Sequence, residues 1–196
     1  MNENPSSVSK PKRGAFGVVF LTIFLDMVGF SVIFPLFPEM LDHYLEKDVD
    51  GGLLTRFVSS IQHLGFTSEN AGFRIETVIF GGVLGSLFAI LQFLFAPIWG
   101  HWSDRIGRRP IMLMSVGGTC LGYLVWIFAG NFWALVLSRV VGGMASGNLS
   151  VATAAIADVT PRETRAKGMA LVGIAFGLGF ILGPAIGGLA WMYRGE

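Results

Sequence analysis

Two charged residues stand inside long apolar stretches of this sequence. Asp26 lies within residues 15–34 and Arg139 within residues 132–157, and neither stretch contains another Asp, Glu, Lys or Arg. An ionisable side chain in such surroundings costs at least a few kcal/mol, so it usually faces a wet cavity or a partner. Asp26 can take up and release a proton. Arg139 keeps its charge, and its planar fork can hold an anionic group.

The depth of the two charges follows from the ends of their stretches. At 1.5 Å per helical residue, Asp26 lies roughly 16 Å from Ala15 and Arg139 roughly 10 Å from Phe132. If the stretches cross about 30 Å of hydrocarbon in opposite directions, both residues fall within about 5 Å of one depth, which predicts that they can pair. Two interpretations stay open: Asp26 titrates in a cavity, or a permanent ion pair only orients two helices.

Two uncharged polar residues are weaker candidates for lining a substrate path. Gln92 lies within residues 77–100, and Asn148 follows Arg139 in the same stretch. Polar residues in lipid more often form hydrogen bonds between helices than bind a ligand, so both interpretations are kept.

Membrane-spanning helices are the elements that would position these residues. The chain has 196 residues, of which 53% are hydrophobic and 14% charged, and its mean hydropathy is +0.63. Five nearly uncharged stretches each reach the roughly 20 residues that cross a bilayer as a helix. They are residues 15–34, 77–100, 110–129, 132–157 and 168–193. The predicted fold class is an all-α polytopic membrane protein.

Charge and cysteine content exclude several other classes of protein. A net charge of +1 gives no electrostatic basis for binding nucleic acid. Cys120 is the only cysteine, which excludes a disulfide framework and a cysteine-based metal site. The sequence shows no Ser/His/Asp set, metal cluster or phosphate-binding loop, so neither an enzyme nor a cofactor is expected.

Basic residues predict how the spans are oriented. They are concentrated in the tail 1–14 and in the connections after the second and fourth spans, and they are sparse in the long connection 38–76. Because positive charge favours the cytoplasm, the N-terminus is expected in the cytoplasm. The protein is expected in the cytoplasmic (inner or plasma) membrane. Helical spacing of apolar residues in the outer connection predicts a short amphipathic helix on the outer surface. These residues are Leu53, Leu54, Phe57, Val58, Ile61 and Leu64.

The connection between the second and third spans carries an ordered motif, Gly-x-x-x-Asp-Arg-x-Gly-Arg-Arg. A simple positive anchor would need only the arginines and does not explain this order. The motif residues are Gly100, Asp104, Arg105, Gly107, Arg108 and Arg109. The motif resembles the signature of the major facilitator superfamily in the same connection, with Trp102 where Leu is more usual. The resemblance implies that this loop works in an inner gate.

Glycines of the fifth stretch extend the resemblance. Their series is similar to the antiporter motif of drug:proton antiporters, and the residues around Asp26 resemble tetracycline-resistance-like members. The series comprises Gly173, Gly177, Gly183, Pro184, Gly187 and Gly188. Gly173, Gly177, Pro184 and Gly188 recur at close to helical spacing and predict a groove that admits another helix. The resemblance implies that the groove packs against a second half of the transporter.

This resemblance implies a secondary active transporter, with proton-coupled export (antiport) of amphipathic organic compounds such as drugs. Its expected partners are the lipid bilayer, a small organic substrate and protons. The alternative is a facilitator-like receptor or regulatory subunit without transport, which could lose the intramembrane charges Asp26 and Arg139. Facilitators are built from two six-helix halves. Residues 15–196 are therefore expected to be part of an N-terminal half, without the sixth span and the C-terminal half, and to insert but not transport alone.

Overall fold

The computed structural model describes residues 13–48, 52–63 and 74–193, and within these ranges the chain is almost entirely helical. Five helical segments are long and apolar enough to cross a membrane, which confirms the predicted all-α polytopic fold class. In chain order the elements are α1 (Arg13–Ser31), the 3-10 turn η1 (Phe34–Leu36), α2 (Phe37–Lys47), α3 (Leu53–His63), α4 (Ile75–Ile106), α5 (Arg108–Ile127), α6 (Phe132–Ala145), α7 (Asn148–Val159) and α8 (Arg165–Tyr193).

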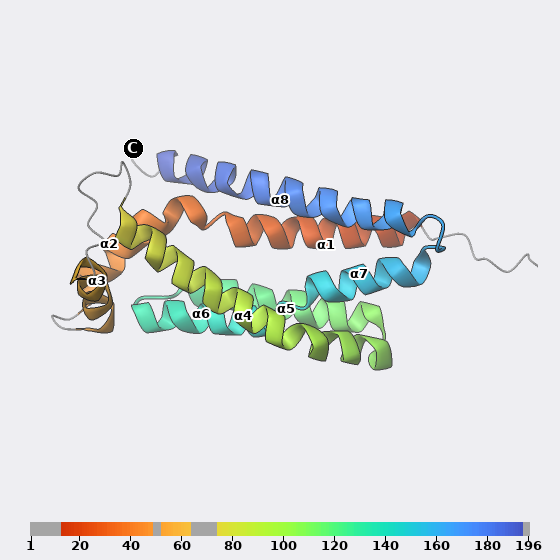
Figure 1. Cartoon of the computed structure of the whole chain (residues 1–196), viewed down its shortest axis with the longest axis horizontal. Helices are drawn as coiled ribbons and strands as arrows, with labels where there is room; N and C mark the ends of the chain where they lie inside the picture. Colours follow the sequence, from red (N-terminus) through yellow and green to blue (C-terminus); the bar gives the residue numbers. More distant parts are fainter. Residues whose placement is uncertain (1–12, 49–51, 64–73, 194–196) are drawn as a thin grey trace, which may run out of the picture.

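The helices form two layers (Figure 1). α1 and α8 lie side by side in one layer, while α4, α5 and α6 make up the other. α7 connects the layers because it packs against helices of both. The short helices α2 and α3 gather at one end of the bundle, beside the end of α8, and α1 begins at the opposite end.

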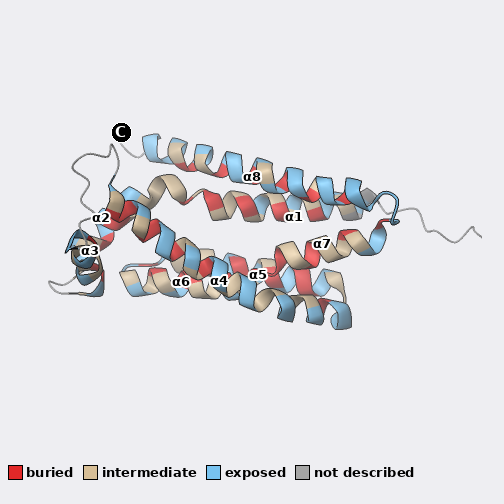
Figure 2. Ribbon diagram, in the orientation of Figure 1, coloured by how far each residue is buried: buried red, intermediate tan, exposed pale blue. Residues whose placement is uncertain are grey.

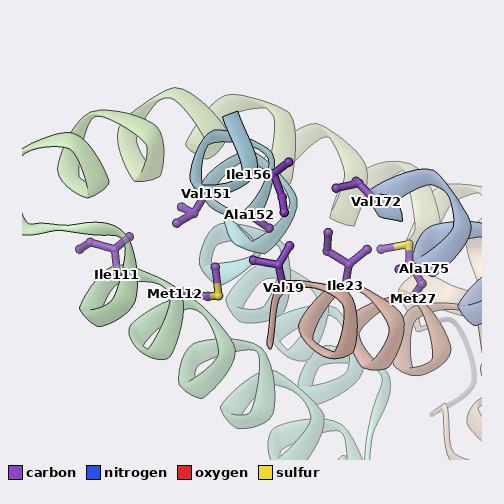
Figure 3. Packing of buried hydrophobic residues seen from close by; sticks show 10 residues of the cluster. All are labelled: Val19, Ile23, Met27, Ile111, Met112, Val151, Ala152, Ile156, Val172 and Ala175. Atoms are coloured by element: carbon purple, nitrogen blue, oxygen red, sulfur yellow. The ribbon is translucent and has the colours of Figure 1, made fainter. Parts of the chain in front are cut away.

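A buried apolar cluster around α7 joins the two layers (Figure 3). Val151, Ala152 and Ile156 of α7 are fully buried, with 0% exposure each. Around them pack Val19, Ile23 and Met27 of α1, Ile111 and Met112 of α5, and Val172 and Ala175 of α8. The outward faces of the long helices are exposed instead (Figure 2) and carry large apolar side chains such as Phe93 and Ile181. Such faces are suited to lipid rather than water.

The contact between α1 and α8 is the most extensive helix pair of the bundle, and it depends on glycines. Gly179, Gly183 and Gly187 lie on one face of α8 and are buried against the backbone of α1. A Cβ at Gly179 would lie 2.6 Å from the Phe24 carbonyl oxygen. The Ser31 hydroxyl of α1 donates to the Gly179 carbonyl at 3.3 Å. Absent side chains therefore let the two backbones approach closely.

Three predicted spans differ from the helices that the structure shows. The first does not end near residue 34, because η1 and α2 continue it to Lys47. The second continues to Ile106, through residues that the hydropathy pattern assigned to a loop. The fourth is interrupted between Ala145 and Asn148. Hydropathy marks the part of a helix that is apolar and does not detect its polar continuation or a break inside it.

The predicted amphipathic helix of the outer connection is present as α3. Leu54 and Ile61 are buried, and the helix packs against α2 and α4. Asp48 accepts hydrogen bonds from the Thr55 backbone N–H and hydroxyl at 2.8 and 3.0 Å in the first turn. Leu64, included in the prediction, lies outside the described residues.

Gly183→Ala should lower the free energy of unfolding by about 1–3 kcal/mol, the usual cost of overpacking. The added Cβ would lie 2.8 Å from the Val28 carbonyl oxygen and would overlap the Ser31 hydroxyl. Gly177→Ala is the matched control, because nothing lies within 4 Å of its Cβ position and the gain in helix propensity is the same. Thermal unfolding in detergent measures both variants. Equal stability of the two would contradict the close packing of α1 on α8.

Candidate functional site

Asp26 lies in α1, and its carboxylate is held by a residue of α7. The side-chain amide of Asn148 donates to Oδ1 of Asp26, with 3.2 Å between nitrogen and oxygen. Asn148 is the first residue of α7 and is only 2% exposed. Its own amide oxygen has no hydrogen-bond partner among the described residues. The pair therefore presents a carboxylate and an unpartnered amide oxygen close together.

A cavity of about 270 Å³ opens beside this pair, between α1, α5 and α7. Its walls are mostly apolar, and Thr22, Thr119 and Tyr123 add hydroxyl groups. The other lining residues are Val18, Leu21, Leu25, Val116 and Cys120. A few polar groups in an apolar cavity suit an amphipathic molecule, whose polar part would meet Asp26 while its apolar part lies against the walls.

Tyr123 is a site residue that the sequence interpretation missed. Its phenol lines the cavity beside Asp26 and lies within electrostatic range of the Arg139 guanidinium. It is packed against Gly29 of α1, where a Cβ would lie 2.5 Å from the Tyr123 oxygen. A phenol in the middle of an apolar span was the available signal, because a buried tyrosine hydroxyl usually has a polar partner.

Arg139 is buried in α6, with 5% exposure, and has no carboxylate partner among the described residues. The carbon of its guanidinium lies 4.9 Å from the centre of the Trp126 ring, and its Nε donates to the Ser138 hydroxyl at 3.4 Å. It also borders a small cavity whose phenylalanines are Phe30, Phe34, Phe37 and Phe88. A buried cation on an indole face, without a carboxylate beside it, is suited to an anionic group.

The predicted pairing of Asp26 with Arg139 is wrong in this structure. Asp26 meets Asn148 instead, which follows Arg139 by nine residues in the fourth span, or roughly 13 Å along a helix. The depth estimate assumed that the spans start at the ends of the apolar stretches. Because α1 runs on to α2 and the fourth span is interrupted, residue counts from the ends of the apolar stretches do not decide which side chains meet.

Gln92 contacts the interruption of the fourth span rather than the cavity beside Asp26. Its Nε2 donates to the Ser146 hydroxyl at 2.8 Å. Of the four polar residues singled out from the sequence, the structure therefore brings together Asp26 and Asn148. Gln92 lies in α4 of the second span, and Arg139 lies in α6 of the fourth span, before the interruption.

The turn between α4 and α5 is organised around Arg108. Its guanidinium pairs with Asp104 at 2.6 Å and with Asp158, near the end of α7, at 2.8 Å. It also donates to the Ser103 hydroxyl at 2.5 Å. Gly107 is the single residue between the two helices and has a φ of 108°, a conformation that favours glycine.

This geometry accounts for much of the motif order. Asp104 lies in the last turn of α4 and Arg108 begins α5, so the two side chains pair across the turn at Gly107. The other motif residues, Gly100, Arg105 and Arg109, lie at the surface or partly exposed. The motif therefore ties the end of the second span to the fourth span through one arginine.

The glycines of the fifth span divide between two faces of α8. Gly183 and Gly187 pack against α1, within the bundle. Gly173, Gly177 and Gly188 have no neighbouring atom within 4 Å of their Cβ positions. The spacing of 3.6 residues per turn separates the two sets. Only the second set has the open surface that the predicted groove for another helix requires.

A bundle of apolar spans with charges inside and this charged turn defines a polytopic membrane protein, and one family model matches it. The family model described as Major Facilitator Superfamily matches residues 19–194. The chain belongs to the major facilitator superfamily and is an integral multi-pass membrane protein.

Two named relatives and one solved structure are similar to most of this chain. Major facilitator superfamily domain-containing protein 10 of Bos taurus is 42% identical, over 90% of this chain and 39% of its own length. The class E tetracycline resistance protein of Escherichia coli is 36% identical, over 88% of this chain and 36% of its own. The crystal structure of the human organic anion transporter MFSD10 (TETRAN) matches with a TM-score of 0.78 and 38% identity, over 92% of this chain and 42% of that one. The chain thus spans about two fifths of the length of these relatives.

Arg108→Ala should destabilise the protein by about 1 kcal/mol, because partly exposed ion pairs contribute modestly even in a network. Its removal leaves Asp104 and Asp158 without the shared cation. Arg109→Ala is the control, since Arg109 is exposed and adjacent in sequence. Thermal unfolding in detergent compares the two variants. If Arg108→Ala loses no more stability than Arg109→Ala, Arg108 does not tie the two spans together.

Proposed function

We propose that this chain supplies the proton-coupling part of a secondary active transporter, which exports amphipathic organic compounds in exchange for protons. The observation on which the proposal rests is the surroundings of the Asp26 carboxylate. It lies in a span, borders a cavity, and is held by the neutral amide of Asn148 instead of a cation.

A neutral partner matters because it leaves both protonation states of Asp26 accessible. A carboxylate paired with a buried arginine would stay ionised. Asp26 can instead bind a proton, or bind a donor group of a substrate in the cavity. Competition between proton and substrate for one carboxylate makes their binding mutually exclusive, which couples their exchange when the site alternates between the two sides of the membrane.

Under this proposal, Arg139 binds an acidic or polar oxygen group of the substrate. It cannot release its proton, so it acts as a fixed charge. One solved relative is described as an organic anion transporter, and other relatives are named for tetracycline resistance. Both descriptions fit a site in which a cation and a carboxylate occupy separate positions within apolar walls.

The remaining features fit a transporter cycle. The excess of basic residues in the tail 1–14 and around Arg108 supports an N-terminus in the cytoplasm, in an inner or plasma membrane. The Arg108 turn would then lie on the inner side and hold the inner gate closed. The open face of α8 at Gly173, Gly177 and Gly188 is suited to packing against a second half of the transporter.

Asp26→Asn should abolish uptake driven by a pH gradient in inverted vesicles, because asparagine cannot carry the proton. Labelled tetracycline is the first probe. Counterflow of the probe without a gradient should persist at a higher KM, since the cavity and Asn148 remain while the carboxylate that binds the substrate is lost. Asp42→Asn is the matched control, because it makes the same chemical change at an exposed carboxylate, which pairs with Arg74 outside the cavity.

Two results would contradict this proposal. Unchanged pH-driven uptake in Asp26→Asn would remove Asp26 from the coupling. Saturable binding of substrates without any counterflow in the unmodified transporter would favour a receptor instead.

Arg139→Ala should raise the KM for an anionic substrate about 10- to 100-fold, the cost of losing a charged hydrogen bond. Arg139→Lys should recover only part of this loss, because a point charge does not reproduce the planar fork on Trp126. Arg56→Ala in α3 controls for the loss of an exposed arginine. Full recovery with lysine, measured by initial rates of uptake, would reduce Arg139 to a simple counter-charge.

A further inference from the structure

We infer that Ser115 of α5 and Gln92 of α4 are positioning residues: they fix the interruption of the fourth span so that Asn148 meets Asp26. The inference rests on the proposed function only in giving Asp26 a role in coupling. The assignment itself comes from the hydrogen bonds around Ser146 and Gly147.

The interruption exposes backbone groups that a continuous helix would satisfy. α6 ends at Ala145 and α7 begins at Asn148. The carbonyls that end α6 and the amides that begin α7 have no partners within their own helices. In a bilayer such groups must be bonded by other parts of the protein.

Ser115 bonds to both sides of the interruption. Its hydroxyl donates to the Ala145 carbonyl at 2.6 Å and accepts from the Gly147 backbone N–H at 2.8 Å. The side chain is fully buried, with 0% exposure. The Gly147 N–H also donates to the Ala145 carbonyl at 2.8 Å, so the Ser115 hydroxyl reinforces a direct link between the last residue of α6 and the residue that precedes α7.

α4 holds the interruption from another direction. Gln92 donates to the Ser146 hydroxyl at 2.8 Å. The Trp99 indole N–H donates to the Met144 carbonyl at 2.8 Å, and its ring occupies the space that a Cβ on Gly147 would need. The two helices that flank the interruption therefore set its geometry from outside the fourth span.

The consequence for Asp26 follows from the position of Asn148. It is the first residue of α7, so the direction in which α7 starts decides where its amide lies. The other titratable groups that border the Asp26 cavity are Tyr123 and Cys120, both on α5, and Arg139 of α6 acts on Tyr123. The charged residues of α7 and α8 lie only near the helix ends, at Asp158, Arg165 and Lys167. Asn148 is thus the polar contact through which the interruption acts on Asp26.

The test measures protonation of Asp26 directly in the purified, complete transporter. Infrared difference spectroscopy follows the carboxylic acid C=O band that is missing in Asp26→Asn, and a pH titration gives its midpoint without any substrate. Asn148→Ala should shift the titration midpoint of Asp26 by roughly one pH unit, because it removes a hydrogen bond to a charged group. Ser115→Ala and Gln92→Leu should move the midpoint in the same direction.

Double variants separate positioning from general damage. In the Asn148→Ala background, Ser115→Ala and Gln92→Leu should cause no further shift, since the contact they position is gone. Thr153→Ala is the control, because its hydroxyl bonds only to carbonyls of its own helix and should leave the midpoint unchanged. Gln92 is only partly buried, so its variant remains informative if Ser115→Ala does not fold.

Three outcomes would overturn the inference. The first is an unchanged titration midpoint of Asp26 in Gln92→Leu while Asn148→Ala shifts that midpoint. The second is that the shifts of the midpoint add in the double variants. The third is the absence of any carboxylic acid band from Asp26. Loss of the proposed function has a different signature. If vesicles show no proton-driven flux while the infrared midpoints shift as expected, the positioning holds and the transport proposal fails.

Discussion

Inside a bilayer no water reaches the backbone, so every polar group must find its partner within the protein. This constraint explains why the interruption at Ser146 and Gly147 is surrounded by side chains from two other helices. Ser115 and Trp99 bond to backbone groups at the break, and Gln92 bonds to the Ser146 side chain within it. The cost of leaving such groups unbonded makes the break a fixed feature of the fold rather than a flexible joint.

The same environment changes how helices hold together. Apolar side chains gain little by leaving lipid for another helix, so packing and short polar contacts decide the association. α1 and α8 accordingly meet at Gly179, Gly183 and Gly187, where backbone approaches backbone. Because α1 carries Asp26, this contact also fixes the helix that presents the carboxylate. On an adjacent face of α8, Gly173 and Gly177 have no neighbour within 4 Å of their Cβ positions among the described residues, which leaves that surface open.

The sequence predicted those features that depend on periodicity and composition. The five spans and the helix α3 follow from apolar runs and helical spacing, and the order Asp-Arg-x-Gly-Arg-Arg identified the family that the comparison shows. The pairing of Asp26 was not predicted correctly, because it depends on where the fourth span breaks. Nothing in the hydropathy of residues 132–157 marks Ser146 and Gly147 as a break, since small residues are equally common at helix contacts. Tyr123 was missed for a related reason: its partners come from other helices.

The separation of Asp26 from Arg139 has a consequence for coupling under the proposed function. A direct ion pair would let protonation of Asp26 release Arg139 at once. Here the carboxylate meets Asn148 on α7, while the guanidinium lies on α6, on the other side of the interruption. A change in the charge of Asp26 can therefore reach Arg139 by two routes. One runs through Tyr123, which lies within electrostatic range of both, and the other is a shift of the fourth span as a body. The bonds from Ser115 to both sides of the break favour the second route, because they make α6 and α7 move together.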